Sequence, residues 1–253
     1  DPHVQRLFDS CRVMRMDLPY THEQVSTAII ETVRRNGLNA CYIRPLAYKG
    51  TGTITLDARG AQTEFAIMAF DFGPLMGADG IKNGVDVMVS SWRRMAPDTH
   101  ASMTKAGGNY VNSGFVTMEA NDLGYMEGIT LDVNGHVSEG SGENIFAVYR
   151  GAIYTPPVGA SILLGVNRSF IISLAREMGY EVREETFPRE MLYVADELFF
   201  TGTAVEVTPI RSVDRIKIGN GARGPITEKI QDQFFGIISG EIPDQHGWMT
   251  LVK

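Results

Sequence analysis

Few residues in this sequence could bind a metal ion or form a disulfide. The 253 residues include only Cys11 and Cys41, and the five histidines do not stand at metal-ligand spacing from one another. With no CxxC pair, the two cysteines could bond only to each other, and reduced thiols in a cytoplasmic protein are expected instead. The sequence therefore predicts neither a histidine-built metal centre nor a disulfide framework.

Long apolar runs and basic clusters are lacking too. No stretch of about eighteen apolar residues occurs, so no membrane-spanning helix is predicted, and the first ten residues contain no apolar signal region. Lysine and arginine number 23 against 30 acidic residues, and this net charge of −7 argues against nucleic acid as a partner. Hydrophobic residues at 43% suit a folded chain with a large core.

Several segments carry strong signals for secondary structure. Thr21 and Gln24 form a capping-box pair ahead of an apolar stripe, which predicts a helix over 21–36 that ends at Gly37. The other expected elements are strands over 40–48, 64–70 and 85–91, helices over 111–123 and 167–179, hairpins over 128–140 and 143–157, a strand–turn–strand over 196–210, and a last helix from Pro225. Strands and helices mix without regular alternation, which favours an α+β (mixed α/β) fold over a doubly wound sheet.

Three local predictions are sharper. Asn134-Gly135 is the favoured sequence of a type I′ hairpin turn, and Arg150-Gly151 stands at the turn of the second hairpin. Asn167 is predicted to cap the helix over 167–179.

The domain organisation is predicted from a break in the pattern. Residues 71–84 are rich in glycine and show no periodicity. We expect a small N-terminal domain over 1–72, a linker over 73–84 and a larger domain over 85–253.

The stretch MTKAGGNY, residues 103–110, places a lysine beside backbone that offers it little cover. Gly107 and Gly108 have no side chain, so a planar ligand could approach closely, and Tyr110 could aim its phenol near the amine of Lys105. A desolvated lysine is a nucleophile toward carbonyl groups and can form a Schiff base. Taken alone, the stretch is as typical of a flexible loop as of a lysine that binds a cofactor.

Three further stretches supply candidate partners for this lysine. Glu139 lies in a glycine-rich bend, SEGSGEN (138–144), where its carboxylate could face a protonated ring nitrogen. LLGVNRS (163–169) stands at a predicted helix start that favours a phosphate, and TGTAVE (201–206) is a turn that could bind a second anion. Singly they are typical of a solvated turn acid, a simple cap and a tight turn. Together with Lys105 they are the components of a pyridoxal phosphate site.

Stretches along the whole chain resemble the branched-chain amino acid aminotransferases, which are fold-type IV enzymes dependent on pyridoxal phosphate. The matching stretches, in order, are RLFDS, YIRPL, SSWRRMAPDTH, KAGGNY, VSEGSGEN, YTPP and GTAVEVTPIRSVD. The resemblance implies a two-domain fold, with a small α/β domain and a larger pseudo-barrel α/β domain. It implies amino-group transfer between leucine, isoleucine or valine and 2-oxoglutarate, giving branched-chain 2-oxo acids and L-glutamate.

The resemblance also implies residue roles toward the cofactor. Lys105 would hold pyridoxal phosphate covalently and later move the substrate proton, Glu139 would pair with the pyridine nitrogen, and Tyr110 would bond the phenolic oxygen. The residues implied in phosphate binding are Arg6, Val166, Asn167 and Thr203.

For the substrate, the resemblance implies a pocket with one charged rim. Tyr42, Arg44 and Phe72 match pocket residues of the small domain, and Arg44 would receive the side-chain carboxylate of glutamate or 2-oxoglutarate. Thr203 and Ala204 would hold the α-carboxylate. Because burying an unpaired charge costs several kcal/mol, Arg44 is expected to turn outward or stay solvated when leucine binds.

The sequence departs from the family pattern in two places. The family commonly has Pro, Thr and Asp where this chain has Leu164, Asn167 and Ser169, and we expect weakened but retained phosphate binding. Family members also carry several dozen residues before QRLFDS, whereas this chain starts almost there. Either the sequence is incomplete or the small domain lacks its opening strands.

Two other classes of function stay open at this point. One is a related fold-type IV enzyme, such as a D-amino acid transaminase or an aminodeoxychorismate lyase, against which KAGGNY and YIRPL argue. The other is a non-catalytic remnant of the fold, against which the retained Lys105 and Glu139 argue. The expected partners are amino acids and 2-oxo acids, and a homodimer or an assembly of dimers is expected because fold-type IV sites are usually completed by a second subunit.

Overall fold

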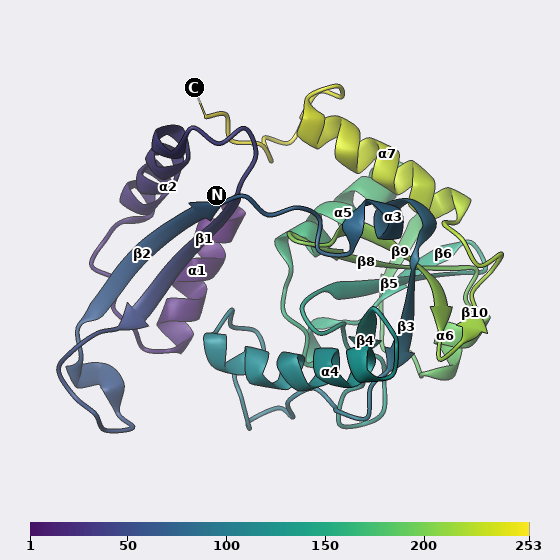
Figure 1. The fold of residues 1–253 in the computed structure, drawn as a ribbon, viewed down its shortest axis with the longest axis horizontal. Coiled ribbons are helices and arrows are strands. Elements are labelled where there is room, and N and C mark those ends of the chain that lie inside the picture. Colours follow the sequence, from purple (N-terminus) through teal and green to yellow (C-terminus); the bar gives the residue numbers. More distant parts are fainter. Residues whose placement is uncertain (253) are drawn as a thin grey trace. The chain divides into compact units, whose positions relative to one another are not determined.

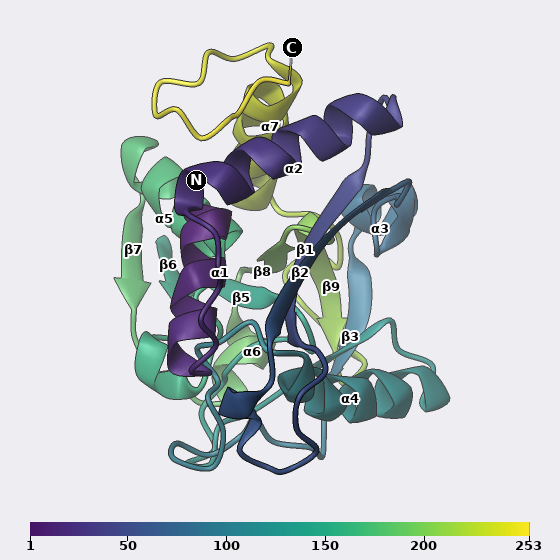
Figure 2. The same ribbon diagram turned by 90° about the vertical axis from the view of Figure 1, so that its left-hand side faces the viewer.

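The computed structural model describes residues 1–252, which fold into two compact units (Figures 1 and 2). The first unit comprises Asp1–Gly73 together with the segment that begins at Gln245, and the second comprises Pro74–Asp244. Within the stretch expected as a linker, Gly77–Asn83 form helix α3, which belongs to the second unit. The domain boundaries drawn from the sequence stay a prediction.

The first unit is a β-hairpin with two helices. Strands β1 (Tyr42–Lys49) and β2 (Thr63–Phe70) pair antiparallel, and helix α2 (His22–Asn36) packs on both. The predicted capping box is confirmed, since Thr21 Oγ1 accepts from Gln24 N and Thr21 N donates to Gln24 Oε1. The expected left-handed Gly37 follows, at φ 62°.

Helix α1 (Pro2–Val13) was not among the elements expected from the sequence. Pro2 suits its first turn, and its buried side of Val4, Ser10 and Cys11 is too short and polar to give a strong apolar period. A short 3-10 helix, Ala58–Gly60, precedes β2.

A mixed eight-stranded sheet forms the centre of the second unit. The strands are β3 (Val85–Val89), β4 (Glu127–Ile129), β5 (Asn144–Tyr149), β6 (Ala152–Thr155), β7 (Glu181–Glu184), β8 (Glu197–Gly202), β9 (Glu206–Val213) and β10 (Ile216–Lys217). Their order is β4-β3-β9-β8-β5-β6-β7, with β10 paired to β9. Strand β3 runs parallel to both neighbours and β6 runs parallel to β7, whereas the other pairs are antiparallel. The mixed α/β class expected from the sequence is confirmed.

Both faces of the central strands are covered. The second unit's longer helices are α4 (Tyr110–Asp122), α5 (Val166–Glu177) and α7 (Pro225–Ser239), and α6 (Glu190–Val194) is a single short turn. On β5 and β8, Phe146 and Phe199 stack with ring centroids 5.0 Å apart, while their alternating neighbours join the main hydrophobic core. Helices α5 and α7 contact each other and β8, and Figure 1 shows them together above the sheet.

One of the two hairpin turns agrees with the sequence prediction and the other does not. Arg150 and Gly151, at φ 51° and 81°, form the predicted two-residue turn between β5 and β6. At the first hairpin Gly135 N donates to Asp132 O, and Gly135 alone of the predicted pair has positive φ, at 87°. The type I′ turn at Asn134-Gly135 is therefore wrong, because the Asp132 carboxylate accepts from Asn134 N and His136 N and fixes a longer turn.

The predicted cap of α5 is also wrong. The helix begins at Val166 with Gly165 as its N-cap, and Asn167 is its second residue. In the described part of the chain no side chain caps this helix end. Its first backbone N–H groups are consequently left to other acceptors.

Candidate active site

Lys105 and Tyr110 lie side by side at the start of α4. Lys105 Nζ donates to Tyr110 Oη over 2.5 Å. The 3-10 helix Gly107–Asn109 brings the two together, and the buried Asn109 holds the loop by donating to Ala101 O (3.1 Å) and Thr104 O (2.9 Å). Lys105 is exposed in the structure.

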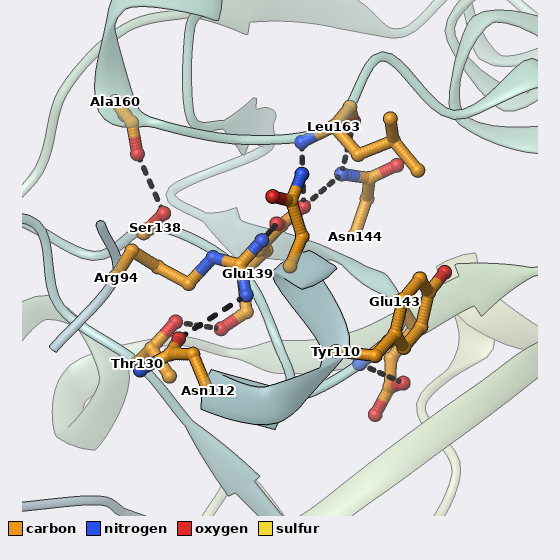
Figure 3. Close-up of polar contacts among 12 residues, drawn as sticks. Arg94, Tyr110, Asn112, Thr130, Ser138, Glu139, Glu143, Asn144, Ala160 and Leu163 are labelled. Atoms are coloured by element: carbon orange, nitrogen blue, oxygen red, sulfur yellow. Dashed lines mark hydrogen bonds and ion pairs between the residues drawn. The ribbon is translucent and has the colours of Figure 1, made fainter. Parts of the chain in front are cut away.

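Glu139 is buried and paired. Its Oε1 lies 2.6 Å from Arg94 Nη2, and both side chains are 5% exposed. Its Oε2 accepts from Asn144 Nδ2 and from Leu163 N, each at 3.0 Å. Figure 3 shows Arg94 and Asn144 reaching Glu139 from opposite sides, so the carboxylate has a fixed orientation.

Burial raises the pKa of Glu139 to about 7, although nearby positive charges oppose the change. Arg94 lowers it most among the charges, and Lys105 and Arg168 lower it further. Lys105 therefore lies close enough to Glu139 for its charge to act on the carboxylate. A further positive charge near Glu139 would lower its pKa and favour the carboxylate.

Two buried carboxyl groups, Glu127 at the start of β4 and Glu143, lie beside the bend that follows Glu139. Gly142 N donates to Glu143 Oε2 (2.9 Å), and Ser141 Oγ donates to Glu127 Oε2 (2.8 Å). Burial, and then the charge of Glu127, raise the pKa of Glu143 well above its ordinary range. Glu143 Oε2 accepts from Gly142 N, whereas Glu143 Oε1 is buried and has no hydrogen-bond partner among the described residues. Burial and the neighbouring Glu127 charge therefore both favour the neutral form of Glu143.

The start of α5 lies against the same side chains. A Cβ built on Gly165 would meet Asn144 Oδ1 at 2.2 Å, so the helix end and the Asn144 amide are in close contact. Asn144 Nδ2 also donates to Leu163 O (2.9 Å). Val166 and Asn167, predicted to bind phosphate through backbone N–H groups, occupy the first two positions of the helix.

The turn between β8 and β9 carries the predicted anion-binding residues Thr203 and Ala204. Thr203 is exposed and Ala204 is half-buried. Leu75 N donates to Ala204 O (3.0 Å), and Thr201 Oγ1 donates to Glu206 O (2.9 Å). These bonds fix the backbone of the turn from both sides.

The first unit brings together the predicted substrate residues Tyr42, Arg44 and Phe72. The ring centroids of Tyr42 and Phe72 lie 5.1 Å apart, and Phe70 packs 5.6 Å from Tyr42. The Arg44 guanidinium stands 5.4 Å from the Tyr42 centroid and is exposed. The three aromatic rings therefore form one cluster, with the exposed Arg44 guanidinium beside it. Arg6, predicted to bind phosphate, lies half-buried on α1.

Sequence reasoning missed two residues of the Glu139 environment, Arg94 and Asn144. Both lie in stretches that carried the family resemblance, SSWRRMAPDTH and VSEGSGEN. An arginine doublet two residues after the strand predicted over 85–91 was the available signal for Arg94. Its partner lies 45 positions away, so neither period nor spacing could identify the pair.

Comparison with known proteins places this arrangement in a family. The family described as amino-transferase class IV matches residues 1–213. The chain belongs to the class IV aminotransferases. The branched-chain-amino-acid aminotransferase of Escherichia coli (strain K12) is 47% identical over 252 residues, which cover 99% of this chain and 82% of that protein.

Solved structures of class IV aminotransferases are similar over the full chain. The crystal structure of the Escherichia coli branched-chain amino acid aminotransferase matches with a TM-score of 0.98 at 46% identity, covering 100% of this chain and 83% of that one. The T.th. branched-chain amino acid aminotransferase with pyridoxamine 5′-phosphate matches with a TM-score of 0.95 at 39% identity, with the same coverage. The expected fold-type IV architecture is confirmed.

Class IV aminotransferases use pyridoxal phosphate, and the residues of this chain fit that cofactor. Lys105 offers an amine next to a phenol, and Glu139 offers a buried carboxylate whose orientation is fixed by Arg94, Asn144 and Leu163. Among residues 1–252, by contrast, no cluster of three or more His, Cys, Asp or Glu side chains is arranged to hold a metal ion.

Two further expectations concern thiols and membranes. Cys11 and Cys41 are both free thiols in the described part of the chain, the first buried and the second half-buried. No helix between residues 1 and 252 has the length and apolarity needed to cross a membrane.

Proposed function

We propose that this class IV aminotransferase transfers amino groups between branched-chain L-amino acids and 2-oxoglutarate. The products are branched-chain 2-oxo acids and L-glutamate. The identity of 47% to a branched-chain-amino-acid aminotransferase, over nearly the whole chain, carries this proposal. The aromatic group of Tyr42, Phe70 and Phe72 beside the solvated Arg44 supports it, because one pocket must accept both apolar and acidic side chains.

Three residues of the chain would have separate roles at the cofactor. When bound, pyridoxal phosphate supplies an aldehyde that condenses with amines and a protonated ring that accepts an electron pair. Lys105 Nζ would hold the cofactor and then take the proton from the substrate Cα. Tyr110 Oη, 2.5 Å from Lys105 Nζ, would orient the amine and donate to the phenolic oxygen. Glu139 would hold the proton on the ring nitrogen.

The remaining residues would bind anionic groups. We assign the phosphate to the backbone N–H groups of Val166 and Asn167, where the helix dipole favours negative charge. The Thr203 hydroxyl and, as the resemblance implies, the Arg6 guanidinium would add to it. Thr203 and Ala204 would also hold the substrate α-carboxylate, and Tyr42, Arg44 and Phe72 would contact its side chain.

Amino-donor profiling with 2-oxoglutarate tests the function. The purified protein with added pyridoxal phosphate should use leucine, isoleucine and valine and form glutamate. Activity with D-alanine but not with leucine would reject the proposal in favour of a D-amino acid transaminase.

A homodimer, or an assembly of dimers, is proposed as well. Along one face of α4, Val111, Phe115 and Met118 are 64%, 40% and 54% exposed, and Trp92 stacks on Phe115 at 4.7 Å. An apolar patch of this kind is typical of a protein contact. Light scattering after size-exclusion chromatography would measure the assembly. A cytoplasmic location is proposed from the free thiols.

A further inference from the structure

The contact between Arg94 and Glu139 is an ion pair with both partners buried. Arg94 Nη2 and Glu139 Oε1 are 2.6 Å apart, and each side chain is 5% exposed (Figure 3). Removing two charges from water is unfavourable unless the geometry is good, and removing only one partner leaves an uncompensated charge. The loop that follows β3 holds Arg94 in place, because Arg94 N donates to Leu131 O (2.9 Å).

The other side of the carboxylate is fixed independently of Arg94. Asn144 Nδ2 and Leu163 N both donate to Glu139 Oε2, at 3.0 Å. A carboxylate can accept about four hydrogen bonds. With three donors in place, one acceptor position remains for a further donor such as a protonated ring nitrogen.

The charge of Glu139 depends on the groups around it. Burial raises its pKa to about 7, and the opposing positive charges are Arg94, Lys105 and Arg168, with the Leu163 N–H acting after Arg94. The nearby acid is Glu143, which is itself affected by the charge of Glu139. Arg94 is the only one of these charged groups in a described ion pair with Glu139.

We propose that Arg94 is a positioning residue that keeps Glu139 ionised and aimed at the cofactor's ring nitrogen. This inference rests on the proposed function. Arg94 would act through Glu139, with which it forms the buried ion pair. A neutral Glu139 would be a hydrogen-bond donor and could not neutralise a protonated ring. If loss of Arg94 raised a pKa of about 7 by about one unit, the ionised fraction at pH 7 would fall from about a half to about a tenth.

The test compares Arg94→Met with Arg93→Met. Arg93 is the adjacent arginine, and its Nη1 donates to Asp132 O and Val133 O, away from Glu139. In Arg94→Met the acid limb of the kcat/KM profile for leucine should move to higher pH by about one unit or more. The Kd for pyridoxal phosphate, measured by equilibrium dialysis, should rise about five-fold at pH 7, in proportion to the lost ionised fraction, and less at pH 9.5. Arg93→Met should change neither.

Two further variants make the result decisive. Arg94→Lys keeps the charge and should restore most of the wild-type profile, and Arg94→Gln carries the test if the methionine variant does not fold. In the Glu139→Gln background, Arg94→Met should have little further effect on cofactor affinity. An unmoved acid limb, or the same loss in that background, would overturn the inference. Wild-type protein without leucine activity would instead reject the proposed function.

Discussion

Tyr110 Oη accepts a hydrogen bond from Lys105 Nζ across a single 3-10 turn, with 2.5 Å between the two atoms. Tyr110→Phe should keep the fold but lower kcat with leucine and 2-oxoglutarate. A hydrogen bond to a charged group contributes about 1.5–3 kcal/mol, so the loss should be about ten-fold or more. Steady-state kinetics measure it, and Tyr149→Phe, at the far end of β5, is the control that should retain full activity.

Lys105→Ala should abolish covalent attachment of the cofactor. Borohydride reduction of the wild-type protein, followed by digestion and mass spectrometry, should find the reduced cofactor on the peptide that contains Lys105. Loss of the general base should lower the rate about 10²–10⁴-fold. Lys82→Ala, on α3, should still be labelled at Lys105. Labelling of a different lysine in the wild-type protein would contradict the assignment.

Arg44→Ala should separate the two kinds of substrate. Its guanidinium is exposed beside the Tyr42 ring, where it can meet an acidic side chain but contributes nothing to an apolar one. The glutamate half-reaction, followed by stopped-flow absorbance, should slow about ten-fold or more, since a charge-assisted bond contributes about 1.5–3 kcal/mol. The leucine half-reaction should change less than about three-fold. Equal losses would refute the role of Arg44, and Arg35→Ala on α2 serves as the surface control.

Glu143→Gln should stabilise the protein at alkaline pH. The folded-state pKa of Glu143 is raised above its unfolded value, so its contribution to stability is complete below the unfolded pKa and is lost as pH rises through the folded pKa. Glutamine does not titrate, and it keeps the size of the side chain without placing a second charge beside Glu127. Each pH unit in that window costs the wild type about 1.4 kcal/mol, or roughly 3–6 °C of Tm.

Thermal unfolding from pH 5 to pH 9.5 measures this difference. Tm of Glu143→Gln should match the wild type at the acid end and exceed it increasingly as pH rises. The exposed Glu241→Gln should follow the wild type throughout. A constant offset between Glu143→Gln and the wild type would show that Glu143 is ionised over the whole range.

Gly165→Ala should disturb the Glu139 environment from the helix side. The new Cβ would stand 2.2 Å from Asn144 Oδ1, so the amide that donates to Glu139 must move. Overpacking of this kind costs about 1–3 kcal/mol. The free energy of unfolding, measured with denaturant, should fall, and the Kd for pyridoxal phosphate should rise. Gly159→Ala is the control, because no atom of the described residues lies within 4 Å of its added Cβ, and it should leave both quantities unchanged.

The parts of the fold that local chemistry decides were predictable from the sequence. The capping box at Thr21 and the two-residue turn at Arg150-Gly151 depend on neighbouring residues, and both are present. The turn at Asn134 was mispredicted because the Asp132 carboxylate, two residues earlier, competes for the same backbone N–H groups. The turn preference of a residue pair is overridden where a nearby side chain accepts hydrogen bonds from the backbone N–H groups of the turn.

The candidate site divides in the same way. Lys105, Tyr110 and Glu139 stand in short stretches whose composition indicated them, and the first two meet because only five positions separate them. Arg94 belongs to Glu139 through tertiary structure alone, from a different loop. Asn167 was predicted as a cap because its residue type favours that position, but Gly165 takes it since a side chain there would collide with Asn144.

The Asn144 amide has only one usable orientation. Its nitrogen serves both Glu139 and Leu163 O, which turns its oxygen onto the bare backbone of Gly165. Positions 144 and 165 must therefore be changed together in any redesign of the Glu139 environment or of the N-terminus of α5. A variant changed at only one of the two positions would lose the close fit between the Asn144 amide and the backbone of Gly165.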